Sequence, residues 1–351
     1  MMSHSEALAS VREYYGTILK SNKDLQSTAC CTAEAMPPAL RPIAAQIHPE
    51  VLEKFYGCGS PLPAALDGAT VLDLGSGSGR DCFILSKLVG QHGRVIGVDM
   101  TPNQIAVARK HIDYHMKQFG YNQPNVEFRE GLIEGLAEIG VADNSIDVVV
   151  SNCVLNLSPD KERVFKEIFR VLKPGGELYF SDVFASRRIP RELARDPLLL
   201  GECLGGAFYF EDLRRTLSRA GCDDARVMSR APIALTSPAV VTKVGKVAFE
   251  SATIRAFKLA LEDRCEDYGQ VAYYNGTIPD NAHRFVLDDH HTFETGRPML
   301  ICGNTAMMIS ATRYREHFRV VGNTNEHFGL FDCSPTGTAG SGGPSPAGAC
   351  C

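Results

Sequence analysis

The stretch Thr70-Val-Leu-Asp-Leu-Gly-Ser-Gly-Ser-Gly79 decides the fold predicted for this chain. Its first half, Thr70–Leu74, is apolar enough for a buried strand, and its second half alternates glycine with serine before a helix expected near Arg80. A strand, a tight glycine-rich turn and a helix N-terminus in this order supply the parts of a nucleotide-binding site. The stretch therefore indicates an α/β domain with a ligand site at the end of its first strand.

Strands and helices alternate after this point, up to about Met228. Amphipathic helices separate the apolar segments predicted as strands, which are Thr70–Leu74, Arg94–Asp99, Val126–Phe128, Ile146–Ser151 and Glu177–Val183. The helix after Met100 has the clearest start, with Thr101 as N-cap, Pro102 in the first turn and Gln104 in the place of a capping box. This alternation predicts a doubly wound, largely parallel sheet with helices on both faces.

Changes in pattern divide the chain into four parts. Residues 1–60 are predicted to form an N-terminal helical arm, which includes a helix from Ala39 through Phe55 despite Pro42 and Pro49. Residues 61–235 form the α/β domain, and residues 236–333 form a smaller C-terminal α+β domain. Residues 334–351 are rich in glycine, serine and proline and end in Cys350-Cys351, which predicts a disordered tail.

The composition is that of an ordinary globular protein. Of 351 residues, 44% are hydrophobic, and 36 Lys and Arg against 41 Asp and Glu give a formal net charge of −5. Because no basic stripe is present, we expect no nucleic-acid partner. No apolar run approaches the ~18 residues of a membrane span and no signal peptide is evident, so we expect no membrane association and a cytoplasmic location. In that reducing compartment the twelve cysteines should include chemically available thiols.

The spacing of the glycines indicates which nucleoside ligand fits. A dinucleotide fingerprint would place its last glycine where this chain has Arg80. Asp73 lies at the end of the first strand, and Asp99 closes the second strand, where a carboxylate can bind both hydroxyls of a ribose. The pattern Asp-x-Gly-x-Gly-x-Gly with this later acidic residue is similar to the S-adenosylmethionine site of class I (Rossmann-like) methyltransferases. A glycine-rich turn without a ligand is the alternative, which the strand context and Asp99 disfavour.

Three cysteines are placed to reach the same cleft. Cys153 follows the fourth strand, and Cys58 and Cys203 lie in glycine-flanked loops before and after the sheet. Zinc prefers four ligands and often uses C-x-x-C pairs, which this chain lacks, whereas three thiolates suit a soft, pyramidal centre. A buried core role is an equally good interpretation of Cys153 alone, and Cys82 and Cys222 are expected to be core residues.

Five segments together resemble the arsenite S-adenosylmethionine methyltransferases. They are Tyr56–Gly59, Asp73–Asp81, Val150–Cys153, Gly175–Asp182 and the specific Gly-Glu-Cys-Leu-Gly-Gly motif at Gly201–Gly206, and the likeness runs from about Val11 to Cys333. The resemblance implies that Cys58, Cys153 and Cys203 bind trivalent arsenic and that Cys30 or Cys31 is a redox thiol. It implies S-adenosylmethionine as the cofactor. Together with the loop, the predicted cofactor contacts are Tyr56, Asp73, Gly75, Ser76, Gly77, Gly79, Asp99, Met100, Gln104, Ile133, Glu134 and Asn152.

The function implied is methyl transfer from S-adenosylmethionine to trivalent arsenic, as a means of arsenic detoxification. Arsenite or its glutathione adducts would exchange onto the three thiolates, and the products would be mono- and dimethylated arsenicals. Each transfer formally oxidises arsenic, so Cys30 or Cys31 is expected to return electrons by pairing with Cys58 and to be recharged by thioredoxin or glutathione. A monomer is expected.

Several other interpretations stay open at this point. A methyltransferase for an organic small molecule would share the cofactor site, and a non-catalytic arsenic-binding protein would share the thiols. A nicotinamide oxidoreductase is the weakest alternative because of Arg80. The Asp288-Asp289-His290-His291 stretch is interpreted as a solvated polar turn, and Cys350-Cys351 as a reactive but dispensable tail.

Overall fold

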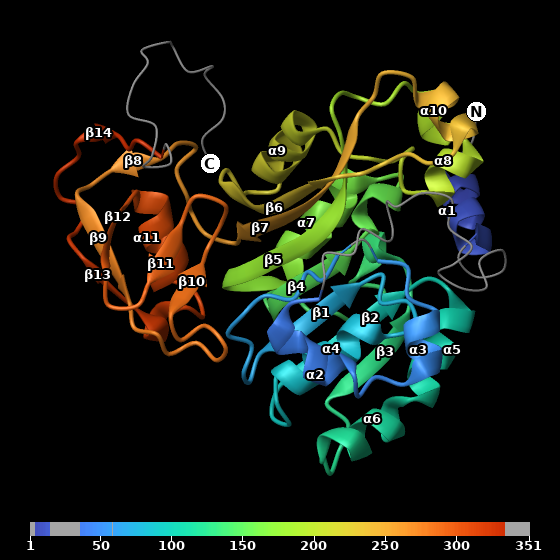
Figure 1. The fold of residues 1–351 in the computed structure, drawn as a ribbon, viewed down its shortest axis with the longest axis horizontal. Helices are drawn as coiled ribbons and strands as arrows, with labels where there is room; N and C mark the ends of the chain where they lie inside the picture. Colours follow the sequence, from blue (N-terminus) through green and yellow to red (C-terminus); the bar gives the residue numbers. More distant parts are fainter. Residues whose placement is uncertain (1–3, 15–35, 58, 334–351) are drawn as a thin grey trace.

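The computed structural model describes residues 4–14, 36–57 and 59–333 (Figure 1). Its largest part is a seven-stranded sheet with the order β3-β2-β1-β4-β5-β7-β6. The five strands predicted from the sequence are all present, and β3, β4 and β5 extend beyond the predicted bounds. The strands of this sheet are β1 (Thr70–Leu74), β2 (Arg94–Asp99), β3 (Val126–Glu130), β4 (Ile146–Asn152), β5 (Leu172–Ala185), β6 (Ala225–Pro232) and β7 (Phe249–Phe257).

The directions of the strands locate a switch point in the sheet. Strands β1 to β5 run parallel to one another, whereas β7 pairs antiparallel with both β5 and β6. The chain moves outward from β1 to β2 and β3, and then returns to place β4 on the other side of β1. Open α/β sheets bind ligands outside the carboxyl ends of the strands at such a point.

Helices cover both faces of the sheet. Successive side chains of a strand point to opposite faces, so each strand contributes to two apolar cores. Val71 and Val95 belong to a core cluster on one face, which includes residues of α2 to α6. Leu72 and Ile96 belong to a cluster on the other face, which includes residues of α7 and α9. This arrangement confirms the predicted doubly wound class I methyltransferase fold. The helices are α2 (Arg41–Ala44), α3 (Pro49–Glu53), α4 (Arg80–Leu88), α5 (Pro102–Lys110), α6 (Ile112–Phe119), α7 (Lys161–Val171) and α9 (Phe210–Arg219).

The remaining elements of this part lie in the N-terminal arm and in the connections after the strands. Helix α1 (His4–Glu13) lies next to α8 (Pro197–Gly201) in Figure 1 and contacts it. Among the described residues, no helix combines the length and the apolar character that crossing a membrane requires. The other short elements are η3 (Pro38–Leu40), η4 (Ile133–Gly135), η5 (Leu155–Leu157), η6 (Leu193–Arg195) and α10 (Pro238–Val244).

The helix predicted for residues 39–55 is wrong in its extent, whereas the predicted start of the helix after Met100 is confirmed in part. The single helix predicted from Ala39 through Phe55 is divided into η3, α2 and α3, because proline is tolerated at the beginning of a helix and not in its interior. Pro49 therefore begins α3, and the His48 imidazole caps that helix by accepting a hydrogen bond from the backbone N–H of Glu50. Helix α5 begins at Pro102 with Thr101 as its N-cap residue, as predicted, but the Thr101 side chain makes no cap hydrogen bond.

The C-terminal part forms a separate small core. Its three-stranded sheet has the order β12-β9-β13, and the hairpin β10–β11 and helix α11 pack around the same apolar cluster. A short ladder, β8–β14, lies at its outer edge (Figure 1). The elements are β8 (Glu266–Asp267), β9 (Gln270–Tyr274), β10 (Arg284–Val286), β11 (Thr292–Glu294), β12 (Pro298–Ile301), α11 (Gly303–Ser310), η7 (Arg315–His317), β13 (Phe318–Val321) and β14 (Gly329–Leu330).

Strand β7 carries the large sheet past residue 235, where the sequence placed the end of the α/β domain. It pairs with β5 continuously from Ala185–Phe249 to Glu177–Phe257. The apolar pattern did not reveal it as a core strand, because the strand contains the buried charge of Arg255. The α/β part therefore ends near residue 257, where the chain enters the C-terminal part.

A buried ion-pair network joins the two parts. Glu177 of β5 is fully buried and pairs with Arg255 of β7 at an Nε–Oε1 distance of 2.6 Å. Arg313 of the C-terminal part pairs with the same carboxylate, and the Tyr314 hydroxyl donates to it at 3.2 Å. Since breaking such a network leaves uncompensated buried charge, it fixes how the C-terminal part sits on the sheet.

Candidate functional site

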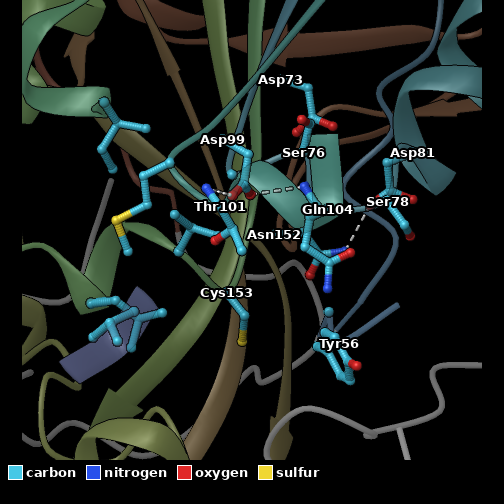
Figure 2. Close-up of a pocket in the computed structure, with 18 of the residues that line it drawn as sticks. Tyr56, Asp73, Ser76, Ser78, Asp81, Asp99, Thr101, Gln104, Asn152 and Cys153 are labelled. Atoms are coloured by element: carbon cyan, nitrogen blue, oxygen red, sulfur yellow. Dashed lines mark hydrogen bonds between the residues drawn. The ribbon is translucent and has the colours of Figure 1, made fainter. Parts of the chain in front are cut away.

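A pocket lies at the switch point, outside the carboxyl ends of β1, β2 and β4 (Figure 2). Asp73 of β1, Asp99 of β2 and Asn152 of β4 all line it, as does Cys153. Eleven of the twelve predicted cofactor residues line this one cavity, which are Tyr56, Asp73, Gly75, Ser76, Gly77, Asp99, Met100, Gln104, Ile133, Glu134 and Asn152.

The glycine loop has a backbone that leaves room for a ligand. Gly75 and Gly77 have left-handed φ angles of 75° and 52°. The backbone N–H groups of Gly75 and Ser76 donate to the Val98 carbonyl at 2.8 and 3.0 Å, which ties the loop to β2. A Cβ atom at Gly77 would meet no atom within 4 Å, so the loop presents an open surface there.

Gly79 is the predicted cofactor residue that does not line the pocket. It is the N-cap of α4, with φ 90°, and a Cβ atom there would lie 2.7 Å from the ring of Phe128. Its place in the motif therefore follows from close packing of the helix against β3 rather than from contact with the cavity.

Two carboxyl groups lie beside the loop. Asp73 accepts a hydrogen bond from the Cys82 thiol at 3.1 Å, and burial together with the nearby Asp81 raises the pKa of Asp73 to about 8. Asp99 accepts from the backbone N–H groups of Gly77 at 2.9 Å and Thr101 at 2.8 Å, while burial raises its pKa. Each carboxylate oxygen has a second lone pair, so Asp99 can still accept from a ribose.

The lining of the cavity fits S-adenosylmethionine. The sulfonium and the ammonium group of that molecule are cations, and the carboxyl groups in the lining outnumber the single lysine, Lys54. The buried hydroxyl of Ser76 has no hydrogen-bond partner among the described residues, so it is available to a polar ligand. The carboxyl groups belong to Asp73, Asp81, Asp99 and Glu134.

Asn152 ties the segment before the sheet to the pocket. Its side-chain amide donates to the Gly59 carbonyl and to the Asp81 carboxylate, both at 2.9 Å. A Cβ atom at Gly57 would lie 2.5 Å from that amide, so only glycine permits this contact. Both described neighbours of position 58 are thus packed close to Asn152.

Arg80 strengthens the same attachment. Its guanidinium pairs with Asp81 at 2.6 Å, donates to the Gly59 carbonyl at 3.3 Å and lies 3.4 Å from the ring centroid of Phe55. The sequence showed only that Arg80 excludes a dinucleotide fingerprint. The structure shows that the residue in that place holds the segment around Gly59 against α4.

Cys153 and Cys203 come together from different elements. Cys153 follows β4 and Cys203 follows α8, and the Cys203 thiol lies 3.8 Å from the Cys153 carbonyl oxygen. Both side chains are buried. The sulfur of Cys153 is in a disulfide bond in this structure.

Hydrogen bonds through Asn156 connect Cys203 to a buried carboxyl group. The Asn156 side chain donates to the Cys203 carbonyl at 2.9 Å, and the Asn156 backbone N–H donates to Asp182 at 3.0 Å. Asp182 is buried, and this burial raises its pKa to about 7. The sequence placed Asp182 at the end of a family motif without a role for its side chain, and the structure connects it to the loop that carries a predicted arsenic ligand.

Other predicted thiols fall outside the described residues. Cys58, Cys30 and Cys31 are among them, as are Cys350 and Cys351. Cys82 and Cys222 are buried as predicted, and Cys82 additionally donates to Asp73.

Helix α1 contributes a lining that the sequence did not indicate. Leu8 and Val11 line the cofactor cavity. The Tyr14 hydroxyl donates to the buried carboxylate of Glu202, next to Cys203, at 3.0 Å. The helical periodicity of the arm predicted that it is a helix, but not which surface it covers.

Comparisons with known proteins agree with this geometry. Residues 65–221 match the methyltransferase domain family, and residues 267–336 match the arsenite methyltransferase C-terminal domain. An arsenite methyltransferase of Aquipseudomonas alcaligenes is 54% identical to this chain, over 92% of this chain and 93% of that protein. The chain belongs to the arsenite methyltransferase family.

Other members of the arsenite methyltransferase family extend this match. The arsenite methyltransferase of Homo sapiens is 41% identical, over 90% of this chain and 84% of that protein. The crystal structure of an arsenic(III) S-adenosylmethionine methyltransferase from Chlamydomonas reinhardtii superposes with a TM-score of 0.82 at 48% identity, over 85% of this chain and 100% of that chain. These matches confirm the predicted family and enzyme class, a methyltransferase that uses S-adenosylmethionine, and they exclude the nicotinamide oxidoreductase.

Proposed function

We propose that this protein transfers methyl groups from S-adenosylmethionine to trivalent arsenic held by the thiolates of Cys58, Cys153 and Cys203. The observation that carries the proposal is the meeting of Cys153 and Cys203 beside a cavity lined by carboxyl groups and a glycine loop. Arsenite, or its glutathione adduct, exchanges its oxygen or sulfur ligands for these thiolates. We propose that this reaction detoxifies arsenic in the cytoplasm, where thiols stay reduced.

The cofactor half of the site is assigned to the groups around the glycine loop. Asp73 would hold the cationic amino-acid end of S-adenosylmethionine, Asp99 would accept from its ribose hydroxyls, and Ser76 would offer a hydroxyl that has no partner among the described residues. When bound, S-adenosylmethionine supplies an electrophilic methyl group on sulfur. The chain's own contribution is to hold the arsenic-binding thiolates at one end of this cavity and to exclude water from it.

The arsenic half of the site is assigned to three loops. Cys153 lines the cavity. Cys203 is not part of the lining, but its sulfur lies 3.8 Å from the carbonyl oxygen of Cys153. The described neighbours of Cys58 pack close to Asn152, the residue before Cys153, which supports placing the third thiol on the same side of the cavity. The disulfide at Cys153 must be reduced before its thiolate binds arsenic. No proton is lost from arsenic in the transfer, so no general base is assigned.

A redox step completes the proposal. Arsenic gives its lone pair to the methyl group and becomes pentavalent, so two electrons must return before arsenic can accept another methyl group. We assign these electrons to Cys30 or Cys31, which forms a disulfide with Cys58 as it is oxidised. Thioredoxin or glutathione then reduces that disulfide. Repetition of the cycle gives monomethylated and then dimethylated arsenicals.

The decisive experiment compares Cys203→Ser with Cys222→Ser. Both thiols are buried, but Cys222 belongs to the core between the sheet and α9. We expect Cys203→Ser to lose methylation of arsenite and to bind S-adenosylmethionine with unchanged affinity, and Cys222→Ser to keep both. Methylated arsenic is measured by chromatography with element-specific detection, and cofactor binding by calorimetry.

The alternatives give different results in this experiment. Wild-type methylation of arsenite by Cys203→Ser would remove this thiol from the reaction. Methylation of an organic compound, but not of arsenite, by the wild-type protein would favour an organic substrate. Arsenic binding without any affinity for S-adenosylmethionine would favour a non-catalytic binding protein.

The redox assignment has its own test. The double variant Cys30→Ser/Cys31→Ser should bind arsenite and complete a first methyl transfer, but it should stall in multiple turnover with a dithiol reductant. The two single variants show which thiol acts. Unchanged multiple turnover in the double variant would take both cysteines out of the mechanism.

A further inference from the structure

Three cysteines of the C-terminal part form a cluster away from the cofactor cavity. The sulfur atoms of Cys265, Cys302 and Cys333 all lie within 4.8 Å of one another. Cys265 and Cys302 are buried, and Cys333 is partly exposed. None of the three lines the cavity that contains Cys153.

The topology of the C-terminal part brings these residues together from distant positions. Cys265 precedes β8, and Cys333 follows β14. Strands β8 and β14 pair with each other in an antiparallel ladder. The Phe331 backbone N–H donates to the Cys265 carbonyl at 2.8 Å and extends this pairing toward Cys333. Cys302 is the N-cap of α11, and its sulfur accepts from the Thr305 backbone N–H at 3.4 Å.

A buried polar network lies behind the cluster. Arg226 is buried between the carboxylates of Asp224 and Asp288, and its guanidinium donates to the Cys302 sulfur at 3.8 Å. The Nδ1 atom of His291 donates to the Asp288 carboxylate at 2.8 Å, and His291 is buried as well. The sequence predicted a solvated turn at Asp288–His291. This prediction is wrong for Asp288 and His291, which are buried, whereas the two residues between them are exposed.

The cluster is reached from the surface. Cys333 lines a second pocket together with Arg226, Asp288 and His290. A small neutral solute such as arsenous acid, As(OH)3, can therefore approach Cys333 without unfolding the domain.

We propose that Cys265, Cys302 and Cys333 form a second binding site for trivalent arsenic. Binding exchanges ligands without oxidation: As(OH)3 and three thiols give one As(S)3 centre and three waters. The sulfur of Cys265 is in a disulfide bond in this structure, so a dithiol or phosphine reductant first opens that bond and is itself oxidised. The thiolate is the ligand form of cysteine, and the positive charge of Arg226 favours it at Cys302.

Charge favours arsenic over zinc at this cluster. Three thiolates on Zn²⁺ leave one net negative charge, and zinc in structural sites takes a fourth ligand. The buried carboxylates of Asp224 and Asp288 already outnumber Arg226, so further negative charge is costly there. An As(S)3 centre is neutral and needs only three ligands, and the group of ligand atoms contains no histidine and no carboxylate.

Arsenic in this site is separated from the methyl donor. Because none of its ligands lines the cofactor cavity, the site holds arsenic without methylating it. Arsenic binding at this second site does not depend on the reaction at Cys153 and Cys203.

The experiment counts bound arsenic in full-length protein. The parent variant carries Cys153→Ser, Cys203→Ser, Cys350→Ser and Cys351→Ser, which removes two thiols of the proposed methylation site and both thiols at the end of the chain. Cys302→Ser, Cys333→Ser or, as the matched control, Cys222→Ser is then added. Each protein is reduced with a phosphine, mixed with arsenite and desalted, and arsenic is counted by elemental mass spectrometry.

We expect Cys302→Ser and Cys333→Ser each to bind one equivalent of arsenic less than the parent, and Cys222→Ser to bind as much. X-ray absorption of the parent should show three sulfur neighbours around arsenic. Equal binding by the parent and Cys333→Ser, or a centre with oxygen neighbours, overturns the proposal. If Cys302→Ser loses its fold because the helix cap is altered, the half-exposed Cys333→Ser decides the question. Restoring Cys153 and Cys203 in the Cys333→Ser protein should return the wild-type methylation rate, which separates this site from the reaction.

Discussion

The thiol of Cys203 lies 3.8 Å from the carbonyl oxygen of Cys153, and both residues have left-handed backbones, with φ angles of 61° and 59°. Residues other than glycine rarely adopt this conformation, which costs on the order of 1–2 kcal/mol. The surroundings enforce it, since the Cys153 N–H donates to Ser181 at 2.8 Å and the Cys203 carbonyl accepts from Asn156. Strain of this kind persists where function requires a particular side chain.

The strain at Cys203 can be measured by comparing Cys203→Gly with Cys203→Ala. At most buried positions glycine is less stable than alanine by about 0.5–1 kcal/mol. At Cys203 we expect the order to reverse, with Cys203→Gly the more stable by about 1 kcal/mol, because glycine adopts this φ without strain. Denaturant unfolding of the reduced proteins gives the two free energies, and neither variant should methylate arsenite. A lower stability of Cys203→Gly would show that the backbone there is unstrained.

Gly57→Ala should disturb the attachment of the segment before the sheet. The added Cβ atom would lie 2.2 Å from the Phe55 ring and 2.5 Å from the Asn152 amide. We expect a loss of stability of about 1–3 kcal/mol and a fall of about tenfold or more in kcat/KM for arsenite, because the ring and the amide must move.

Gly120→Ala is the matched control for this substitution. Gly120 has a positive φ, 75°, which disfavours alanine, but a Cβ atom there would meet nothing within 4 Å, unlike one at Gly57. This variant should lose some stability and keep its kcat/KM. Equal losses of kcat/KM in both variants would mean that general destabilisation, and not the contact with Asn152, explains the effect.

Binding of S-adenosylmethionine should strengthen with pH through the ionisation of Asp73. The pKa of this carboxyl group is raised to about 8, so it is mostly protonated in the free protein at pH 7. A cationic ligand favours the ionised form, so binding at pH 7 should release a proton and the affinity should rise toward pH 8, by up to about tenfold per unit. Asp73→Asn removes this dependence, and the ratio of the two affinities cancels the titration of the ligand. A pH-independent ratio in calorimetry would contradict the assignment.

Glu177→Gln should loosen the connection between the sheet and the C-terminal part. The substitution leaves Arg255 and Arg313 without their shared buried carboxylate. We expect a loss of about 3–5 kcal/mol in the free energy of unfolding. Replacing the exposed carboxylate of Glu138, which pairs with Arg163, should change stability by less than about 1 kcal/mol. Urea unfolding distinguishes the two cases.

The sequence predicted most of the cofactor side of the site, because those residues sit at strand ends that a local pattern reveals. Asp73, Asp99 and Asn152 each end a strand, and strands β1, β2 and β4 share one edge of a parallel sheet. A local sequence pattern does not show a residue whose role depends on a contact with a segment elsewhere in the chain. Arg80 was recognised only as a missing glycine, although it pairs with Asp81 and holds Gly59.

The C-terminal part was the least predictable, because its informative contacts are long-range. Arg226 meets Asp288 and Cys302 across 62 and 76 positions of sequence, and no periodicity reports such pairings. Long-range pairing is a second reason, besides the buried charge of Arg255, why β7 was not recognised as a strand of the large sheet: its neighbours are β5, far upstream, and β6, across α10.

The place of β7 also determines where this chain can be shortened. A protein cut at residue 235, between β6 and β7, would lose an internal strand, so that β6 would have no neighbour and the whole length of β5 from Glu177 to Ala185 would become an open edge. Long unpaired edges invite association with other chains. A shortened protein intended to keep only the catalytic half must therefore extend past Phe257, and even then it must supply new partners for the buried charges of Glu177 and Arg255.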